Sequence, residues 1–298
     1  MTKLGELLAW KLNRVFPTLA IHRELQTAKQ DIAANQRWAY SEAARIVHAF
    51  DPYWDLAGKN ILDIGTGLGG KLPFYVDCGA GSVTGIDLNP QSLRIAQQHI
   101  TGLGLQDRVR LLRSDAARLP FPDDHFEAIV SINVFEHIAR LENAVQETFR
   151  VLKPGGLVFL HLPPYYSPWG PHLENWIHFP WPHLFFSDKT LLRVAAREDA
   201  RRGLNEQFVQ AARIDWEASG GRIPDVNRVT LWRFRKMVRQ TGFTIKQLKL
   251  LPVGYDAFQS SNASLKRAGM QLLNLGARLP LIQEVLVTKM VYVLSKKA

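Results

Sequence analysis

The sequence predicts an α/β protein: a three-layer, Rossmann-like, doubly wound sheet of seven mostly parallel strands with a terminal antiparallel strand. Three observations carry this prediction. Short apolar runs alternate with helical runs between residues 60 and 162, a glycine-rich turn follows the first apolar run, and the chain closes on the long alternating run "EVLVTKMVYVLSKK". A helical cap before this core and an insertion after the fifth strand complete the expected architecture.

Each element of the core has its own signal in the sequence. The expected strands are, in order, "NILDIG", "GSVTGIDLN", "DRVRLLRSDA", "FEAIVSINV", "GGLVFLHLP", "FTIKQLKLLPVG" and the final run. The expected helices include "PQSLRIAQQHITGLG", which has Pro90 in its first turn and glycine at its end, "LENAVQETFRVLK", and "VTLWRFRKMVRQTG", which stops at Gly242. Strand, helix and strand at this spacing indicate a parallel sheet.

The segments outside this core suggest four parts of the chain. Residues 1–55 form an N-terminal helical cap, with apolar residues at helical spacing up to Phe16 and a second helix from about Ile21 to Phe50. Residues 56–162 form the core. Residues 163–226, which begin with "PPYYSPWGPHLENWIHFPWPHLFF", form an aromatic and histidine-rich lid, and residues 227–298 complete the sheet, with a further helix around 263–278.

The turn "LDIGTGLGGKL", residues 62 to 72, matches three nucleotide-binding motifs at once. Gly65, Gly67 and Gly69 match a methyl-donor turn, and Gly65, Gly67 and Gly70 match a dinucleotide turn. Gly65 with Gly70 and Lys71 matches a phosphate loop. Leu72 stands where a phosphate loop needs Ser or Thr to bind Mg²⁺, which argues against the third motif.

Acidic residues outside the turn separate the other two motifs. Asp87 ends the second strand, where either site needs an acid for ribose hydroxyls. Asp63 precedes the first glycine, where a dinucleotide fold usually has an apolar residue and a methyl-donor site uses an acid near an ammonium group. Asp115 follows the third strand, placed to accept a hydrogen bond from an adenine amino group. These acids favour the methyl-donor site.

The ordered series "ILDIGTGLG", "GIDLNP", "RSDAARLPFPDDHFEAIVSINVFEHI" and "RVLKPGGLVFL" resembles the class I S-adenosylmethionine-dependent methyltransferases. It is most similar to the subgroup of quinone-biosynthesis and small-molecule methyltransferases. The resemblance covers residues 60 to 162, and the strands expected between 243 and 296 fit the family's terminal pair. The insertion at 163–226 matches no pattern of the family.

The resemblance implies S-adenosyl-L-methionine as co-substrate and a set of residues that hold it. The glycines at 65, 67 and 69 would line it, Asp63 would lie near its amino-acid end, and Asp87 would hold its ribose. The full set of implied cofactor-binding residues is Asp63, Gly65, Thr66, Gly67, Gly69, Asp87, Leu88, Asp115, Ala116 and Asn133. Leu88 would pack beside the adenine, Ala116 would lie at its edge, and Asn133 would face the acceptor at the end of the fourth strand.

Methyl transfer to a hydroxyl requires a base, and candidates lie in two places. Glu136 and His137 follow the fourth strand, where some relatives carry E-x-x-E-H and hold Mg²⁺. Asn133 replaces the first of those carboxylates, so we assign no metal ligand, although Mg²⁺ near these three residues stays open. The alternative is that Glu136 and His137 cap the next helix. The second place is the insertion, where His172 is the preferred base among His172, Glu174, His178 and His183.

Composition and charge limit the partners. The formal net charge is +10, but no single run of Lys or Arg dominates, and acids interleave the arginines between residues 189 and 239. We therefore expect a small-molecule, glycan or lipid-linked acceptor rather than nucleic acid. The single cysteine, Cys78, excludes an intramolecular disulfide and fits a cytoplasmic protein, as does the absence of a signal-peptide pattern at the start of the chain. The first helix suggests peripheral membrane contact as an alternative to a packed cap.

The predicted function is therefore S-adenosylmethionine-dependent methylation, at oxygen of a small molecule, glycan or lipid-linked acceptor. Two alternatives remain open. One is an RNA methyltransferase that uses the arginines for phosphate binding. The other is a non-catalytic partner protein that binds S-adenosylmethionine.

Overall fold

A computed structural model describes residues 3–16, 31–203, 226–252, 275–276, 279 and 282–297. The chain divides into two compact units. The sheet unit comprises Thr27–Pro163, Leu231–Leu251 and Lys289–Ala298, and the insertion unit comprises Met1–Gln26, Pro164–Thr230 and Pro252–Thr288. Most of the helix expected around 263–278, and the start of the helix expected from Ile21, lie outside the described residues.

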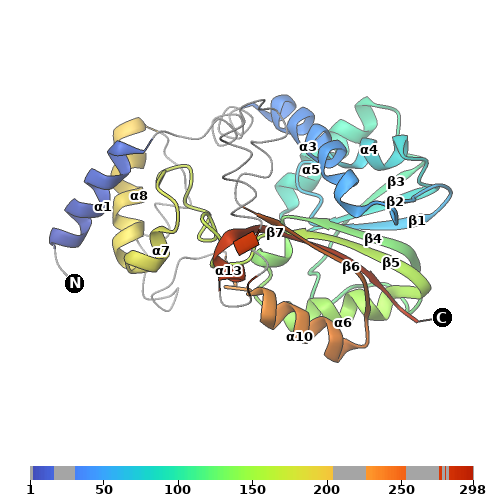
Figure 1. Ribbon diagram of the computed structural model, residues 1–298. Coiled ribbons are helices and arrows are strands. Elements are labelled where there is room, and N and C mark those ends of the chain that lie inside the picture. The colour runs from blue at the N-terminus through green and yellow to red at the C-terminus, as the bar shows by residue number, and fades with distance from the viewer. Residues whose placement is uncertain are drawn as a thin grey trace, which may run out of the picture. The chain divides into compact units, whose positions relative to one another are not determined.

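The predicted fold class is confirmed by the sheet, whose strand order is β3-β2-β1-β4-β5-β7-β6 (Figure 1). Strands β1 to β5 pair in parallel, and β7 is antiparallel to β5. The strands are β1 Asn60–Ile64, β2 Ser82–Asp87, β3 Val109–Arg113, β4 Phe126–Ile132, β5 Leu152–Leu162, β6 Thr244–Pro252 and β7 Val287–Ser295. The central strands are apolar and buried because helices cover both faces of the sheet.

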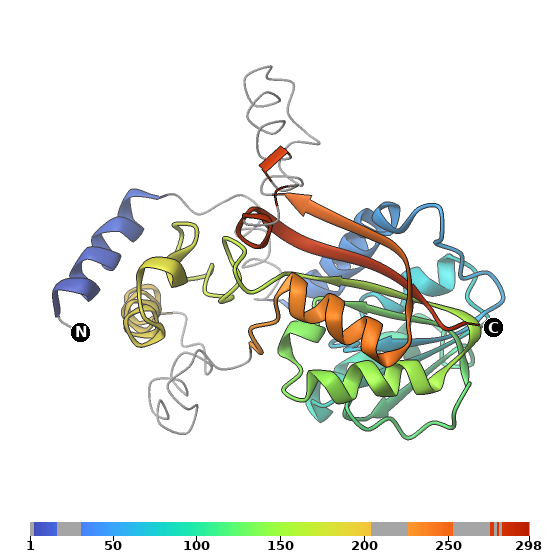
Figure 2. The ribbon, with the colours of Figure 1, turned by 60° about the horizontal axis from the view of Figure 1, so that its bottom comes forward.

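Helices cover both faces of the sheet (Figure 2). One face carries α3 Ile32–Ile46, α4 Leu72–Asp77 and α5 Pro90–Gly102, and the other carries α6 Leu141–Val151 and α10 Leu231–Thr241. Aromatic rings fill the core below each layer. The rings of Trp54 and Phe159 lie 4.9 Å apart on the α4 face, and those of Phe234 and Tyr292 lie 5.2 Å apart on the other. The short helices η1 Val47–Phe50 and η2 Phe135–His137 join these layers to the strands.

The strand order reverses between β1 and β4, since the chain moves outward from β1 to β3 and then returns to β4 on the other side. In doubly wound sheets, ligands bind beyond the carboxyl ends of the strands at such a point. The glycine turn follows β1 and Asn133 follows β4, so both lie there.

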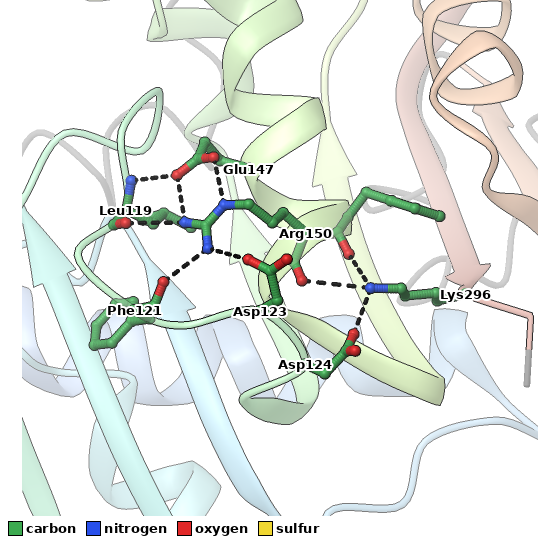
Figure 3. Close-up of polar contacts among 8 residues, drawn as sticks. Leu119, Phe121, Asp123, Asp124, Glu147, Arg150 and Lys296 are labelled. Carbon is green, nitrogen blue, oxygen red and sulfur yellow. Dashed lines mark hydrogen bonds and ion pairs between the residues drawn. The ribbon is translucent and has the colours of Figure 1, made fainter.

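A polar network holds the opposite edge of the sheet, at the amino ends of β4 and β5 (Figure 3). The Arg150 guanidinium donates hydrogen bonds of 2.7 to 3.0 Å to Glu147, Asp123 and the carbonyls of Leu119 and Phe121. Lys296, just past β7, forms an ion pair with Asp124 and donates to the Phe149 carbonyl at 3.1 Å. This network ties the loop before β4 to the end of α6 and to the end of the chain.

The insertion unit has an apolar core of its own. Its described helices are α1 Lys3–Val15, α7 Pro182–Phe185, α8 Asp188–Arg202 and α13 Gln283–Leu286. Ala9 of α1 packs among Trp176, Phe179 and Leu191 from the insertion. The buried Asn13 side chain donates to the Trp176 carbonyl at 2.7 Å and accepts from the His178 amide at 2.6 Å. The first helix of the predicted cap therefore shares one core with the predicted lid, whereas α3, in the second half of the predicted cap, belongs to the sheet unit.

Candidate functional site

The glycine turn leaves β1 with its backbone tied to β2. The Gly65 and Thr66 amides both donate to the Ile86 carbonyl at 2.9 Å, and the Thr66 side chain is buried. Gly65, Gly67 and Gly69 have φ values of 77°, 57° and 81°. These values lie in the left-handed region, which favours glycine. Backbone conformation by itself is therefore sufficient reason for glycine at these three positions.

The space around each glycine differs. A Cβ atom at Gly65 would overlap the Val134 side chain, and one at Gly69 would lie 2.8 Å from the Ala96 Cβ of α5. A Cβ at Gly67 would meet no atom within 4 Å. Gly67 is thus the glycine of the three that presents its backbone to open space, where a ligand can approach it.

Lys71 serves the turn itself. Its side chain is buried, its Nζ donates to the Gly65 carbonyl at 3.3 Å, and the same atom lies 4.0 Å from Oδ1 of Asp63. A phosphate-loop lysine would extend toward its nucleotide instead. The match to a phosphate loop is therefore incidental, as the sequence predicts from Leu72.

Asp63 is a buried carboxylate at the end of β1. Tyr75 Oη donates to its Oδ1 at 3.3 Å, while Oδ2 has no hydrogen-bond partner among the residues that the structure describes. Burial raises the pKa of Asp63, and the positive charge of Lys71 opposes that rise. A buried acceptor without a donor is costly, so a cationic or N–H group of a ligand would satisfy it. This fits the predicted place near an ammonium group.

Asp87 lies across the turn from Asp63, at the end of β2. Its Oδ2 accepts from the Gly67 amide and its Oδ1 from the Asn89 amide, both at 2.9 Å. The carboxylate is thereby fixed beside the open glycine, in the position expected for a group that binds ribose hydroxyls. Leu88 follows with a 61% exposed side chain, available to pack on a planar ring.

Asp115 follows β3, and its two oxygens are both engaged. Oδ1 accepts from the Ala117 amide at 2.8 Å, and Oδ2 forms an ion pair of 2.6 Å with Arg140. The backbone hydrogen bond, followed by the one from Arg140, lowers the pKa of Asp115. Ala116 is buried beside it. An adenine amino group would have to share these oxygens with Arg140, a residue that the motif did not indicate.

Asn133 connects four elements of the sheet unit. Its φ is 55°, its Nδ2 donates to Glu42 of α3 at 3.1 Å, and its Oδ1 accepts from Lys289 of β7 at 2.7 Å. His161 of β5 lies with Nδ1 3.3 Å from the same Oδ1. We call Glu42, Asn133, His161 and Lys289 the Asn133 cluster. Sequence reasoning found Asn133 alone, because no motif marks the other three.

Glu136 and His137 lie in η2, directly after β4. Glu136 is 1% exposed, and neither of its carboxylate oxygens has a hydrogen-bond partner among the described residues, so it does not cap α6. Burial raises the pKa of Glu136. His137 is exposed, with Nε2 3.9 Å from Oε1 of Glu136. Of the two, Glu136 has the environment of a group that a ligand completes.

The histidines of the insertion have different environments. His172 is half-buried with a φ of 56°, and its amide donates to the Trp169 carbonyl. His178 is buried with Nε2 2.9 Å from Arg202, which marks a structural role. His183 has Tyr165 and Tyr166 beside it, neither ring nitrogen has a partner among the described residues, and burial lowers its pKa to about 4. The preference for His172 as the base stays a prediction.

The strand order with its reversal and the helices on both faces define the class: a Rossmann-like domain. Residues 62–160 match the family model described as "Methyltransferase domain". This stretch is a class I S-adenosylmethionine-dependent methyltransferase domain, as the sequence motifs predict, and the methyl donor of this family is S-adenosylmethionine.

Two relatives match beyond that stretch. A demethylmenaquinone methyltransferase of Thermus thermophilus is 36% identical over 152 residues, 50% of this chain and 65% of that protein. A ubiquinone biosynthesis O-methyltransferase of Pseudomonas putida is 30% identical over 142 residues, 45% of this chain and 60% of that protein. Sterol methyltransferases match over shorter stretches. The chain spans less than two thirds of the length of these relatives.

The fold also matches solved structures. An S-adenosylmethionine-dependent methyltransferase from Mesorhizobium loti superposes with a TM-score of 0.51 at 17% identity, covering 87% of this chain and 98% of that one. At this identity, the likeness concerns the fold alone.

Proposed function

We propose that the protein transfers a methyl group from S-adenosylmethionine to an oxygen of a small-molecule, glycan or lipid-linked acceptor. The observation that carries the proposal is the turn after β1. It presents the open backbone of Gly67, whose amide fixes Asp87, and it follows directly on Asp63, whose Oδ2 lacks a donor among the described residues. The rest of the predicted donor site extends from this turn to Asp115 and Asn133.

The residues present fit the methyl donor. S-adenosylmethionine supplies a methyl group already activated by its sulfonium, so the protein has to align the acceptor, exclude water and deal with the hydroxyl proton. Asp87 would hold the ribose hydroxyls, Leu88 would cover the adenine, and Asp63 would accept from the amino-acid end. Glu136, His137 and His172 remain the proposed candidates for proton transfer.

The relatives support a small acceptor. Their names refer to quinones and to sterols, which favours a ring-shaped, apolar acceptor for this chain as well. The insertion unit offers a surface for contact with the membranes that hold such compounds: α1 exposes Leu4, Leu8 and Val15 beside the exposed cations Lys11 and Arg14. Apolar and basic residues on one short helix suit peripheral contact with an anionic membrane. No helix among the described residues is both long and apolar enough to cross a membrane.

The RNA alternative receives less support from the arginines. Arg193 pairs with Glu6, Arg201 pairs with Glu198, and Arg233 pairs with Glu142. Arginines engaged in this way are less available to phosphates.

Calorimetry with S-adenosylhomocysteine, NADH and ATP tests the donor site. We expect S-adenosylhomocysteine alone to bind, and Asp87→Ala to weaken that binding by about tenfold or more, the scale of a lost charge-assisted hydrogen bond. Undiminished binding by Asp87→Ala would refute the site assignment. Transfer of labelled methyl groups into separated small-molecule, lipid and RNA fractions of a cell extract tests the acceptor class, and no transfer into any fraction would favour a non-catalytic binding protein.

A further inference from the structure

The Asn133 cluster lies beside the donor turn. Asn133 ends β4 at the point where the strand order reverses, and the next residue, Val134, packs against Gly65 of the turn. His161 and Lys289 come from the neighbouring strands β5 and β7, at the same edge of the sheet. A group held by this cluster would therefore lie next to the reacting end of a bound methyl donor.

Hydrogen bonds orient the cluster. The amide of Asn133 donates through Nδ2 to Glu42, so its Oδ1 acts only as an acceptor, and it accepts from Lys289. The contact of Oδ1 with Nδ1 of His161 then requires the proton on Nδ1. The other ring nitrogen, Nε2, keeps its lone pair and can accept a hydrogen bond.

The lysine is the member with spare donors. Lys289 is half-buried and, among the described residues, makes one hydrogen bond, to Asn133, and no ion pair within 4.0 Å. An ammonium group has three N–H donors, so two remain available. Half-burial removes part of the water shell from this ammonium group, and an anionic group of a ligand would compensate for that loss.

Three titratable groups of the sheet unit, Glu42, Glu136 and His161, lie within electrostatic reach of Lys289. Burial, followed by the charges of Lys289 and Lys71, holds the pKa of His161 well below its usual range, so the imidazole is neutral. Burial raises the pKa of Glu42 on α3 and of Glu136 on η2, and the positive charges of Lys289 and Lys71 oppose that rise at both carboxyl groups.

We propose that Lys289, held in place by Asn133, binds and stabilises the ionised hydroxyl of the acceptor, which makes the acceptor an acidic hydroxyl on an aromatic or enolic ring. This inference rests on the methyl transfer proposed above. A phenol has a pKa of about 10, and an adjacent cation lowers such a value by about 1 to 3 units, to about 7 to 9. An aliphatic alcohol ionises at much higher pH and stays neutral after the same shift.

The step balances without a further reagent. The hydroxyl releases its proton to solvent on binding, and the resulting oxygen anion lies at the Lys289 ammonium. A lone pair of that oxygen forms the new O–C bond while the C–S bond of the donor breaks, and the bonding pair of electrons stays on sulfur. Charge is conserved because an anion and a sulfonium give two neutral products.

Ionisation of p-nitrophenol, whose anion absorbs visible light, tests the inference in the full-length protein loaded with S-adenosylhomocysteine. We expect the bound phenol to ionise about 1 to 3 pH units below the free phenol. Lys289→Met should remove most of this shift, Lys289→Arg should keep it, and Lys246→Met, an exposed lysine of β6, should leave it unchanged. A thermal melt of each variant establishes that it is folded.

Three outcomes would overturn the inference: p-nitrophenol that does not bind, binding without a shift, or an equal shift in folded Lys289→Met. Where a methylated acceptor is found, the pH profile of kcat/KM should also move to higher pH in Lys289→Met. If the wild-type protein does not bind S-adenosylhomocysteine, the proposed function is contradicted instead, so the two failures are distinguishable.

Discussion

Replacing Gly70 with alanine should loosen the donor turn, although Gly70 is outside the three glycines of the methyl-donor motif. Its φ is not positive, so backbone conformation does not require glycine here. A Cβ atom at this position would lie 2.5 Å from the carbonyl oxygen and 2.7 Å from the Cα of Gln36 in α3. Both atoms are backbone, so no side-chain rotation can relieve the overlap.

The size of the effect follows from these distances. Ordinary contacts of a Cβ atom begin near 3.4 Å, so α3 and the turn must separate by about 1 Å. The movement would break the hydrogen bond of 2.9 Å from Gln36 Nε2 to the Leu68 carbonyl, which holds α3 on the turn. Overpacking of this kind costs about 1 to 3 kcal/mol. We also expect weaker binding of S-adenosylhomocysteine, because the displaced turn carries Gly67.

Urea unfolding and calorimetry measure both effects. Gly102→Ala is the matched control, because Gly102 ends α5, its φ is not positive and a Cβ there would meet no atom within 4 Å. We expect that control to change the free energy of unfolding by less than about 1 kcal/mol, in the stabilising direction. Equal stability and equal ligand affinity of Gly70→Ala and the wild type would refute the packing argument.

Two further predictions concern Asp63 and Arg150. Because the folded protein raises the pKa of Asp63 above 3.8, the folded state holds this proton at higher pH than the unfolded state, and the free energy of unfolding should fall as pH rises through that window. Asp63→Asn should lack this pH-dependent contribution. Urea unfolding between about pH 4 and about pH 8 measures it as a change with pH in the difference in free energy of unfolding between variant and wild type. A difference that stays constant with pH would contradict the prediction. Arg150→Ala should cost about 2 to 3 kcal/mol, because two part-buried carbonyls and Glu147 lose their donor, with Arg150→Lys recovering part of the loss. Its affinity for S-adenosylhomocysteine should not change, since the network lies at the opposite edge of the sheet, and a joint loss of stability and affinity would show that the two edges are coupled.

The sequence by itself determined the fold class and the donor end of the site. Strands and helices of a doubly wound sheet are local patterns of apolar residues, and the glycine turn, Asp87 and Asp115 each follow a strand at its carboxyl end, so a linear pattern is enough to place them. The same patterns could not give the reason for Gly70. In the sequence it only matched the two motifs that were rejected, and the structure shows that Gln36 of α3, an element distant in the chain, packs on it.

Tertiary structure alone decided the surroundings of Asn133. Its partners Glu42 and Lys289 are 91 and 156 residues away in the chain, and each occupies an ordinary position in a helix or strand. A single polar residue at such a position has no periodic signature, because its role depends on which strands become neighbours. The sheet order places β5 and β7 side by side, and only that order brings His161, Lys289 and Asn133 to one edge, beside the turn that the motifs had already located.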